Sequence, residues 1–105
     1  MIDQPSVEQI TEKIVAAFGP RRIVLFGSRA RDDAGPESDL DLLIEMESDL
    51  APAERIRAVD RLFTPRVWPL DVLVFTPQEA ARQRASRNSL VQTAEREGRV
   101  LYERS

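Results

Sequence analysis

The residues with the clearest chemical potential in this chain are a Gly-Ser pair and two aspartates that follow it. Gly27 and Ser28 are separated by ten residues from Asp39 and Asp41. Glycine lacks a Cβ, so its backbone can approach a phosphate closely, while a serine hydroxyl and nearby N–H groups donate hydrogen bonds to phosphate oxygens. Carboxylate oxygens suit Mg²⁺ or Mn²⁺. The spacing therefore predicts a site for a nucleoside triphosphate and its metal ions.

The two aspartates open an apolar run at 39–46 that predicts a strand. Alternation along a strand sends Leu40 and Leu42 to one face, and Asp39 and Asp41 to the other. Positions two apart on a strand are separated by roughly 6.5 to 7 Å, so both carboxylates can converge on metal ions that lie about 3.5 to 4 Å apart. The pair is therefore a candidate set of metal ligands.

Asp71 is the third candidate ligand, because it interrupts another apolar run at 70–75. Its parity places it on the opposite face of that strand from Val72 and Val74. If this strand and the strand at 39–46 are neighbours, the Asp71 carboxylate lies within reach of the same metal ions. The alternative is a strand-entry residue that caps a turn or pairs with an arginine.

These residues resemble the nucleotidyltransferases of the DNA polymerase β-like superfamily, whose signature is Gly-Ser, a spacer, Asp-x-Asp and a later strand aspartate. The segments 26–31 and 38–44 are similar to the minimal, MNT-type members, which commonly act beside HEPN-domain proteins in prokaryotic toxin–antitoxin pairs. The segment 97–103 resembles the closing helix-to-strand segment of that family. Such members often have glycine after the second arginine, where this chain has Asp32.

The resemblance implies a reaction in which Asp39 and Asp41 bind two Mg²⁺ or Mn²⁺ ions and Asp71 completes the site beside an attacking hydroxyl. Pyrophosphate would leave. Proteins that catalyse such transfers mainly position groups and neutralise charge. The chain has no histidine, so Asp71, or a hydroxide on its metal, is the predicted general base.

The resemblance also implies that Gly27, Ser28 and Arg29, together with the two aspartates of the Asp-x-Asp motif, bind the nucleotide, with ATP as the expected substrate. Arg29 has an alternative role, since several acidic residues follow it and an ordinary surface ion pair would equally occupy its side chain.

Three functions are compatible with this site. The first is transfer of an NMP, with AMP as the expected group, to a hydroxyl on a HEPN-domain toxin, so that the chain acts as the antitoxin. The second is a catalytically idle antitoxin or assembly module that neutralises its partner by binding. The third is an antibiotic-modifying transferase, which the absence of a second domain to enclose a small acceptor disfavours.

Length and composition predict one small domain over residues 1–105, because 105 residues with 42% hydrophobic content supply one core. The acceptor wall would then come from a partner or from a second copy of the chain. The sequence has no cysteine and no histidine, which excludes thiol catalysis, disulfides and Cys-based zinc sites. This composition is compatible with a reducing cytoplasm.

Charge and hydropathy give further expectations about partners. Residues 1–18 predict an amphipathic helix whose Glu8, Glu12 and Lys13 interrupt any signal-peptide core, and no segment has the ~18 apolar residues of a membrane span. The net charge is −3, and residues 32–49 hold eight acids and no Lys or Arg. We therefore expect a cytoplasmic protein with no membrane contact and no direct nucleic-acid binding.

Periodicity and turn residues predict a mixed order of helices and strands. The order favours an α/β or α+β single-domain fold with a small mixed sheet flanked by helices, and the resemblance implies the polymerase β-like nucleotidyltransferase fold. The expected helices are 6–18, 52–63, 77–84 and 88–97, and the expected strands are 21–26, 39–46, 70–75 and 99–102.

Two side-chain groups outside the motif also receive predictions. Arg82, Arg84 and Arg87 are interpreted as a solvated helix face, with an acidic partner or RNA as the alternative. Leu62, Phe63 and Trp68 are interpreted as core anchors, with a partner-facing patch as the alternative.

Overall fold

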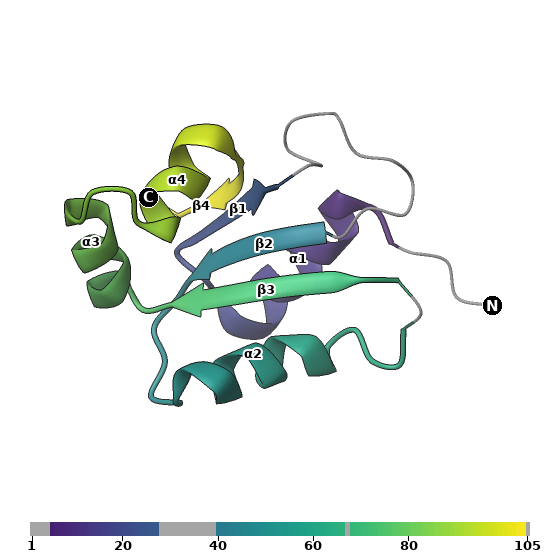
Figure 1. Cartoon of the computed structure of the whole chain (residues 1–105). Helices are drawn as coiled ribbons and strands as arrows, with labels where there is room; N and C mark the ends of the chain where they lie inside the picture. The colour runs from purple at the N-terminus through teal and green to yellow at the C-terminus, as the bar shows by residue number, and fades with distance from the viewer. Residues whose placement is uncertain (1–4, 28–39, 67, 105) are drawn as a thin grey trace.

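A four-stranded mixed sheet forms the centre of the molecule (Figure 1). The computed structural model describes residues 5–27, 40–66 and 68–104. In that part the strand order is β3-β2-β1-β4. Strand β1 is antiparallel to both of its neighbours, while β2 and β3 are parallel. The strands are β1 (Arg22–Phe26), β2 (Leu40–Glu45), β3 (Leu70–Phe75) and β4 (Arg99–Glu103).

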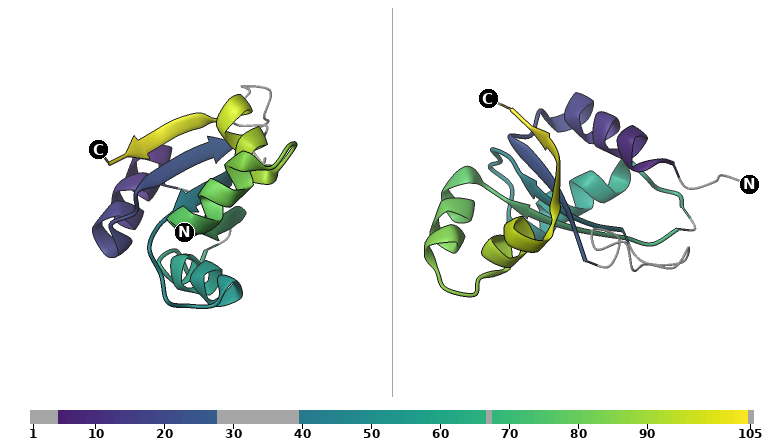
Figure 2. Two further views of the ribbon diagram at one scale, coloured as in Figure 1. Left: turned by 90° about the vertical axis from the view of Figure 1, so that its left-hand side faces the viewer. Right: turned by 90° about the horizontal axis from the view of Figure 1, so that it is seen from above.

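Helices cover both faces of this sheet (Figure 2). Residues of α1 and α2 pack on one face, and α4 packs on the other with α3 beside it. Helix α2 connects the parallel strands β2 and β3, as a crossover connection must. The helices are α1 (Val7–Phe18), α2 (Pro52–Arg61), α3 (Pro77–Ala85) and α4 (Leu90–Glu97).

Helix starts are fixed by side-chain caps that the sequence supplies. Ser6 and Thr76 each form a capping box, in which the hydroxyl accepts from the N–H three residues on and that residue's side chain accepts in return. Ser89 caps α4 by accepting from the N–H of Gln92 at 3.1 Å. Asn88 has a φ of 61°, which helical residues do not adopt. Helix α4 therefore begins at Leu90 rather than at the predicted 88.

Strand alternation divides the apolar side chains between two cores. Leu40, Leu42 and Ile44 are fully buried in the larger core, which α1 and α2 cover. Val24 and Leu43 point to the other face and pack under α4. The period-two prediction for the strand at 39–46 is therefore confirmed for its apolar residues.

Phe63 and Trp68 anchor the larger core, as predicted. Both side chains are buried, and their rings meet edge to face with centroids 5.9 Å apart. Edge-to-face packing suits the charge distribution of aromatic rings. The contact fixes the segment between α2 and β3, which leads directly into Asp71.

The prediction that the arginines of α3 form a solvated face is wrong for Arg84. Its guanidinium binds Glu45 of β2 and Glu95 of α4. Arg82 and Arg87 are exposed, as predicted. Arg84 therefore holds α3 to the rest of the fold instead of facing solvent.

The predicted fold class is confirmed in the described part of the chain, where four helices flank a small mixed sheet. None of these helices has the length and apolar character of a membrane span; the longest, α1, has 12 residues.

Candidate active site

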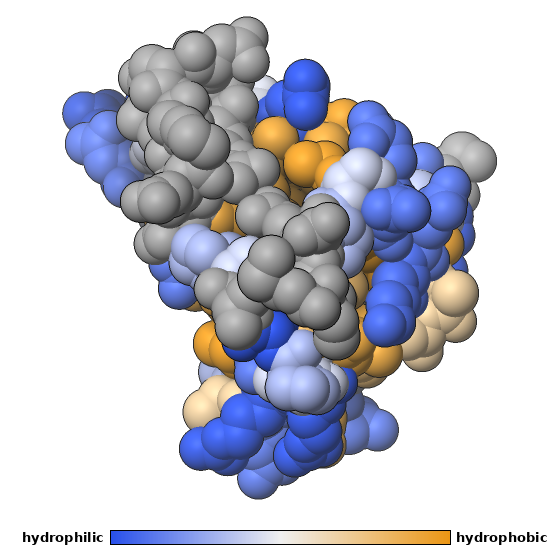
Figure 3. Space-filling model, turned by 90° about the vertical axis from the view of Figure 1, so that its right-hand side faces the viewer, coloured by the Kyte–Doolittle hydropathy of each residue, from blue (hydrophilic) through white to orange (hydrophobic). Residues whose placement is uncertain are grey.

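The candidate site lies at the end of the sheet where β1 ends and where β2 and β3 begin. Gly27, Asp41 and Asp71 belong to the described structure and meet there. Ser28, Arg29 and Asp39 were also predicted for this site, but they lie outside the described residues. Polar side chains make up much of the described surface on this side of the molecule (Figure 3).

Asp41 and Asp71 occupy the same register position on neighbouring parallel strands. Asp41 of β2 pairs with Asp71 of β3 and, on its other side, with Phe26 of β1. Paired residues on adjacent strands lie about 4.8 Å apart in the direction of the backbone hydrogen bonds and point to the same face. The strands that carry Asp41 and Asp71 are therefore neighbours, which is the condition under which Asp71 reaches the Asp-x-Asp motif.

Gly27 packs directly against the Asp41 carboxylate. Its φ is +79°, a conformation that L side chains rarely adopt. A Cβ atom added there would lie 2.3 Å from Oδ2 of Asp41 and 3.2 Å from its Cγ. The turn after β1 and the first carboxylate of β2 therefore share a space that only glycine leaves open.

The surroundings of the two carboxylates differ. Asp41 is half-buried, whereas Asp71 is exposed. Asp71 makes no ion pair with any arginine in the described part of the chain. That observation removes support, within those residues, for the alternative in which Asp71 serves to pair with an arginine.

An apolar row lies directly behind the carboxylates on the same sheet face. Val24, Leu43 and Leu73 occupy it in register across β1, β2 and β3. Val91 and Ala94 of α4 cover its β1 side. Such a row lowers the local dielectric constant, so the charges of the carboxylates act more strongly on a bound cation than they would in water.

The donor chemistry of the site fits a hard divalent cation. Two adjacent carboxylates offer oxygen ligands, which Mg²⁺ and Mn²⁺ prefer. Residues 5–27, 40–66 and 68–104 contain no group of three acidic or other metal-ligating side chains, and Asp39 falls outside these ranges. The assignment of Asp39, Asp41 and Asp71 as the metal ligands stays a prediction.

A network of ion pairs stabilises the opposite end of the same sheet face. We call Arg22, Glu45, Arg84 and Glu95 the charge network. Arg84 Nε donates to Oε1 of Glu95 at 2.9 Å, and its Nη2 binds Oε2 at 2.8 Å. Arg84 also binds Glu45, and Arg22 binds Glu95. The network thus connects α3, α4, β1 and β2.

The charge network shifts the protonation equilibrium of Glu95. The hydrogen bond from Arg84 is the main cause that lowers the pKa of Glu95, and the charges of Arg84 and Arg22 act in the same direction. Burial opposes them by favouring the neutral acid. Glu95 therefore remains ionised at neutral pH and keeps α4 attached to β1 through Arg22.

Sequence reasoning missed this support for the site. Glu45 lies four positions after Asp41 on β2, so its parity already places it on the carboxylate face. Nothing in the local pattern names its partner, because Arg84 is 39 residues away along the chain. The contact is visible only in the folded structure.

The comparisons with known proteins agree with this geometry. The family model for the nucleotidyltransferase domain matches residues 7–102. Among solved structures, the chain is similar to a protein from Sulfolobus solfataricus described as a "putative nucleotidyltransferase", with a TM-score of 0.64 and 22% sequence identity. That match covers 92% of this chain and 77% of the other, and at this identity it shows the fold alone.

No curated protein matches the chain. The family match spans nearly the whole sequence and includes the Gly27 turn and both strands that carry Asp41 and Asp71. The chain belongs to the nucleotidyltransferase domain family.

Proposed function

We propose that this chain transfers AMP from ATP to a hydroxyl group on a HEPN-domain partner protein and so acts as an antitoxin. The observation that carries the transferase part is the in-register pair Asp41 and Asp71, with Gly27 packed against Asp41. Family membership supports generic transfer of a nucleoside monophosphate. The choice of AMP and of a HEPN-domain partner rests on the resemblance of the motif to MNT-type members.

The chain's own residues would perform distinct tasks in this reaction. Asp41 and Asp71, with Asp39, would hold two Mg²⁺ or Mn²⁺ ions. When bound, these ions neutralise phosphate charge and polarise the reacting oxygens. Gly27 leaves room for the Asp41 carboxylate against the turn, beside which the triphosphate would bind. The apolar row behind the carboxylates excludes water from one side of the site.

The bonding changes follow from nucleotidyl transfer. The acceptor oxygen forms a bond to the α-phosphorus of ATP, and the bond from that phosphorus to the pyrophosphate oxygen breaks. The acceptor hydroxyl loses its proton in the process. Asp71 is exposed beside the site and is the group we assign to accept that proton.

The acceptor wall would come from the partner. The strand β3 is an edge of the sheet, and no further described strand pairs with it beyond Asp71. A HEPN-domain protein, or a second copy of this chain, would enclose the acceptor there. ATP and such a partner would meet this chain in the cytoplasm.

The test is intact-mass measurement of the chain and of any protein encoded beside it, after incubation with each NTP and Mg²⁺. Wild-type protein is expected to add an AMP-sized mass to the partner, and D41N is expected to add none. D49N is the matched control, because Asp49 is exposed and lies beyond the end of β2. An adduct that persists in D41N would overturn the assignment of the site.

A second function, neutralisation by binding alone, is favoured by one observation. Val100 of the edge strand β4 is 50% exposed, and it lines a groove between β4 and α1 together with Val7, Val15 and Leu101. Contiguous apolar surfaces of this kind mark interaction sites. D41N protein that still neutralises its partner would support this function. Loss of neutralisation with the complex intact would exclude it.

A further inference from the structure

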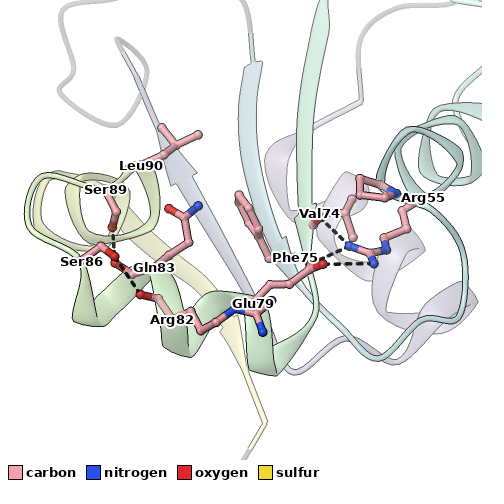
Figure 4. A pocket seen from close by; sticks show the side chains of 10 residues that line it. Arg55, Val74, Phe75, Glu79, Arg82, Gln83, Ser86, Ser89 and Leu90 are labelled. Atoms are coloured by element: carbon pink, nitrogen blue, oxygen red, sulfur yellow. Dashed lines mark hydrogen bonds and ion pairs between the residues drawn. The ribbon is translucent and has the colours of Figure 1, made fainter.

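A cavity of about 590 Å³ lies at the end of β3 opposite Asp71 (Figure 4). Cavities of several hundred Å³ are typical of small-molecule sites. We call it the β3 pocket. Its lining includes Phe75, Gln83, Ser89 and Leu90 on one side, and Arg55 and Glu79 on the other.

One wall of the β3 pocket lies on the same sheet face as the candidate active site, while Val74, which also lines the pocket, points to the opposite face. Phe75 follows Asp71 by four positions on β3, so both side chains point to the same face. The strand advances about 13 Å over this interval. Leu73 lies between them and is only half-buried.

The walls of the β3 pocket suit a flat aromatic ligand. Phe75 is half-buried and its ring borders the cavity beside Gln83 (Figure 4). Leu90 is 43% exposed and supplies a second apolar surface. Aromatic side chains stack on nucleobases, and apolar side chains exclude water from the opposite surface.

Gln83 offers polar recognition in the same pocket. Its Oε1 is shielded from water and accepts no hydrogen bond within the described structure. A buried acceptor without a hydrogen bond is unfavourable, so a ligand that donates an N–H group to it would bind more tightly. The terminal torsion of a glutamine is soft, so the amide can turn its edge toward the cavity. That edge presents an acceptor beside a donor, the pair that matches the amino group and neighbouring ring nitrogen of adenine.

Two arginines line the β3 pocket, the exposed Arg82 and the buried Arg55, and Arg55 is already neutralised. Arg55 is buried, with 6% of its surface exposed, and its Nη1 binds Oε1 of Glu79 at 2.7 Å. Its Nε donates to the carbonyl of Leu50 at 2.8 Å. A guanidinium that is paired in this way has little attraction left for a phosphate. Arg55 therefore gives the pocket no preference for phosphates over the uncharged base of a nucleotide.

The β3 pocket is also held in shape by contacts within its walls. The hydroxyl of Ser89 donates to the carbonyl of Gln83, which ties the start of α4 to α3. Glu79 receives N–H donation from Thr76 at 2.9 Å as well as from Arg55. Pre-formed walls reduce the entropy that binding would cost.

We propose that the β3 pocket receives the nucleobase of the triphosphate whose phosphates bind at Asp41 and Asp71, and that Gln83 selects adenine. This inference rests on the proposed function and adds to it the residues that distinguish one nucleotide from another. Phe75 is the stacking residue, and Gln83 is the specificity-determining residue.

The test is calorimetric binding, with Mg²⁺, of three probes: ATP, purine riboside triphosphate, which lacks the 6-amino group, and inorganic tripolyphosphate, which lacks the base. Wild-type protein is expected to bind ATP more tightly than purine riboside triphosphate. F75A is expected to weaken ATP binding roughly tenfold and to leave tripolyphosphate binding unchanged. Q83L is expected to remove the preference for ATP.

Two further variants serve as controls for Q83L and F75A. Gln78 is an exposed glutamine on the same helix as Gln83, so Q78L should retain the preference for ATP. F75L keeps an apolar side chain without an aromatic surface, and it replaces F75A if the latter does not fold. If F75L and Q83L both bind ATP as wild type does while D41N does not, the pocket inference is overturned and the transferase site stands. If folded wild-type protein binds none of the probes, both proposals fail.

Discussion

Gly27 lies so close to Asp41 that a Cβ at position 27 would sit 2.3 Å from the Oδ2 of Asp41. Real Cβ atoms do not approach an oxygen this closely, so a side chain at position 27 must displace the carboxylate. We predict that G27A lowers nucleotidyl transfer by about 100-fold, because a displacement near 1 Å at a reacting group has an effect of this size. The measurement is the rate of nucleotide incorporation under saturating NTP and Mg²⁺.

Gly19 provides the control for G27A. Its φ is +56°, so alanine there meets similar backbone strain, but no atom lies within 4 Å of the added Cβ. G19A should therefore lose stability without losing transfer activity in the folded fraction. Equal losses of activity in G19A and G27A would show that strain, and not contact with Asp41, is responsible.

Substitution of Asp71 should reduce activity without reducing the stability of the fold. Asp71 is exposed, so we predict that D71N leaves the unfolding free energy within about 0.5 kcal/mol of wild type, as is usual for surface substitutions. Transfer should fall by roughly 100-fold or more, because general-base catalysis contributes at least that much. Urea unfolding and transfer assays on the same preparations make the comparison, with D49N as the control. Full activity in D71N would contradict its assignment.

Metal and nucleotide should stabilise the protein together. A ligand present at about 100 times its dissociation constant adds roughly 2.7 kcal/mol to the unfolding free energy. For a domain of this size, we predict that ATP with Mn²⁺ raises the melting temperature by about 5 °C or more. EDTA should abolish the increase, and D41N should not show it. A melting temperature that rises equally in D41N would indicate a nucleotide site elsewhere.

Strand alternation was enough to predict which face of the sheet carries Asp41 and Asp71. Asp41 and Asp71 were each placed on the face opposite their apolar neighbours, and the structure puts them in one register row. The order of the strands was not predictable, because pairing depends on contacts between segments far apart in the chain. The close approach of Gly27 to Asp41 also depends on pairing between β1 and β2.

Long-range ion pairs explain where sequence reasoning failed. Arg84 lies on a helix with other arginines, and local spacing favoured a solvated face. Its partners Glu45 and Glu95 come from β2 and α4, which no local pattern connects to α3. One smaller error has a local cause, because the left-handed Asn88 delays the start of α4. Helix α2 also ends at Arg61, before the predicted 63.

The charge network should make the unfolding free energy depend on pH in the acid range. The pKa of Glu95 is lowered below its ordinary value of 4.5, chiefly by the hydrogen bond from Arg84. The folded state therefore binds this proton less readily than the unfolded state. The stability it contributes is present above about pH 4.5 and is lost as the pH falls through the lowered pKa.

We therefore predict that the unfolding free energy of wild type falls between about pH 5 and pH 3, and that E95Q reduces the fall. At pH 7, E95Q should lower the unfolding free energy by about 2 kcal/mol, because hydrogen bonds to charged groups contribute on this scale. E97Q is the control, since Glu97 is exposed at the end of the same helix. Parallel pH profiles for E95Q and wild type would show that the network does not carry this dependence.

Glu79 allows the ion pair with Arg55 to be separated from helix capping. The Glu79 carboxylate accepts from the N–H of Thr76 at 2.9 Å and from Arg55 at 2.7 Å. Glutamine also serves at this position of a capping box, so E79Q keeps the cap and removes the charge. Arg55 then stays buried without its counterion.

We predict that E79Q lowers the unfolding free energy by about 3 kcal/mol, since a buried charge that loses its partner is costly. The double variant R55M/E79Q should recover much of that loss, because methionine fills similar space without a charge. R57M is the control, as Arg57 is exposed on the same helix. The measurement is urea unfolding of wild type, E79Q, R55M/E79Q and R57M. If the double variant is less stable than E79Q, Arg55 stabilises α2 through its hydrogen bond to Leu50 rather than through Glu79.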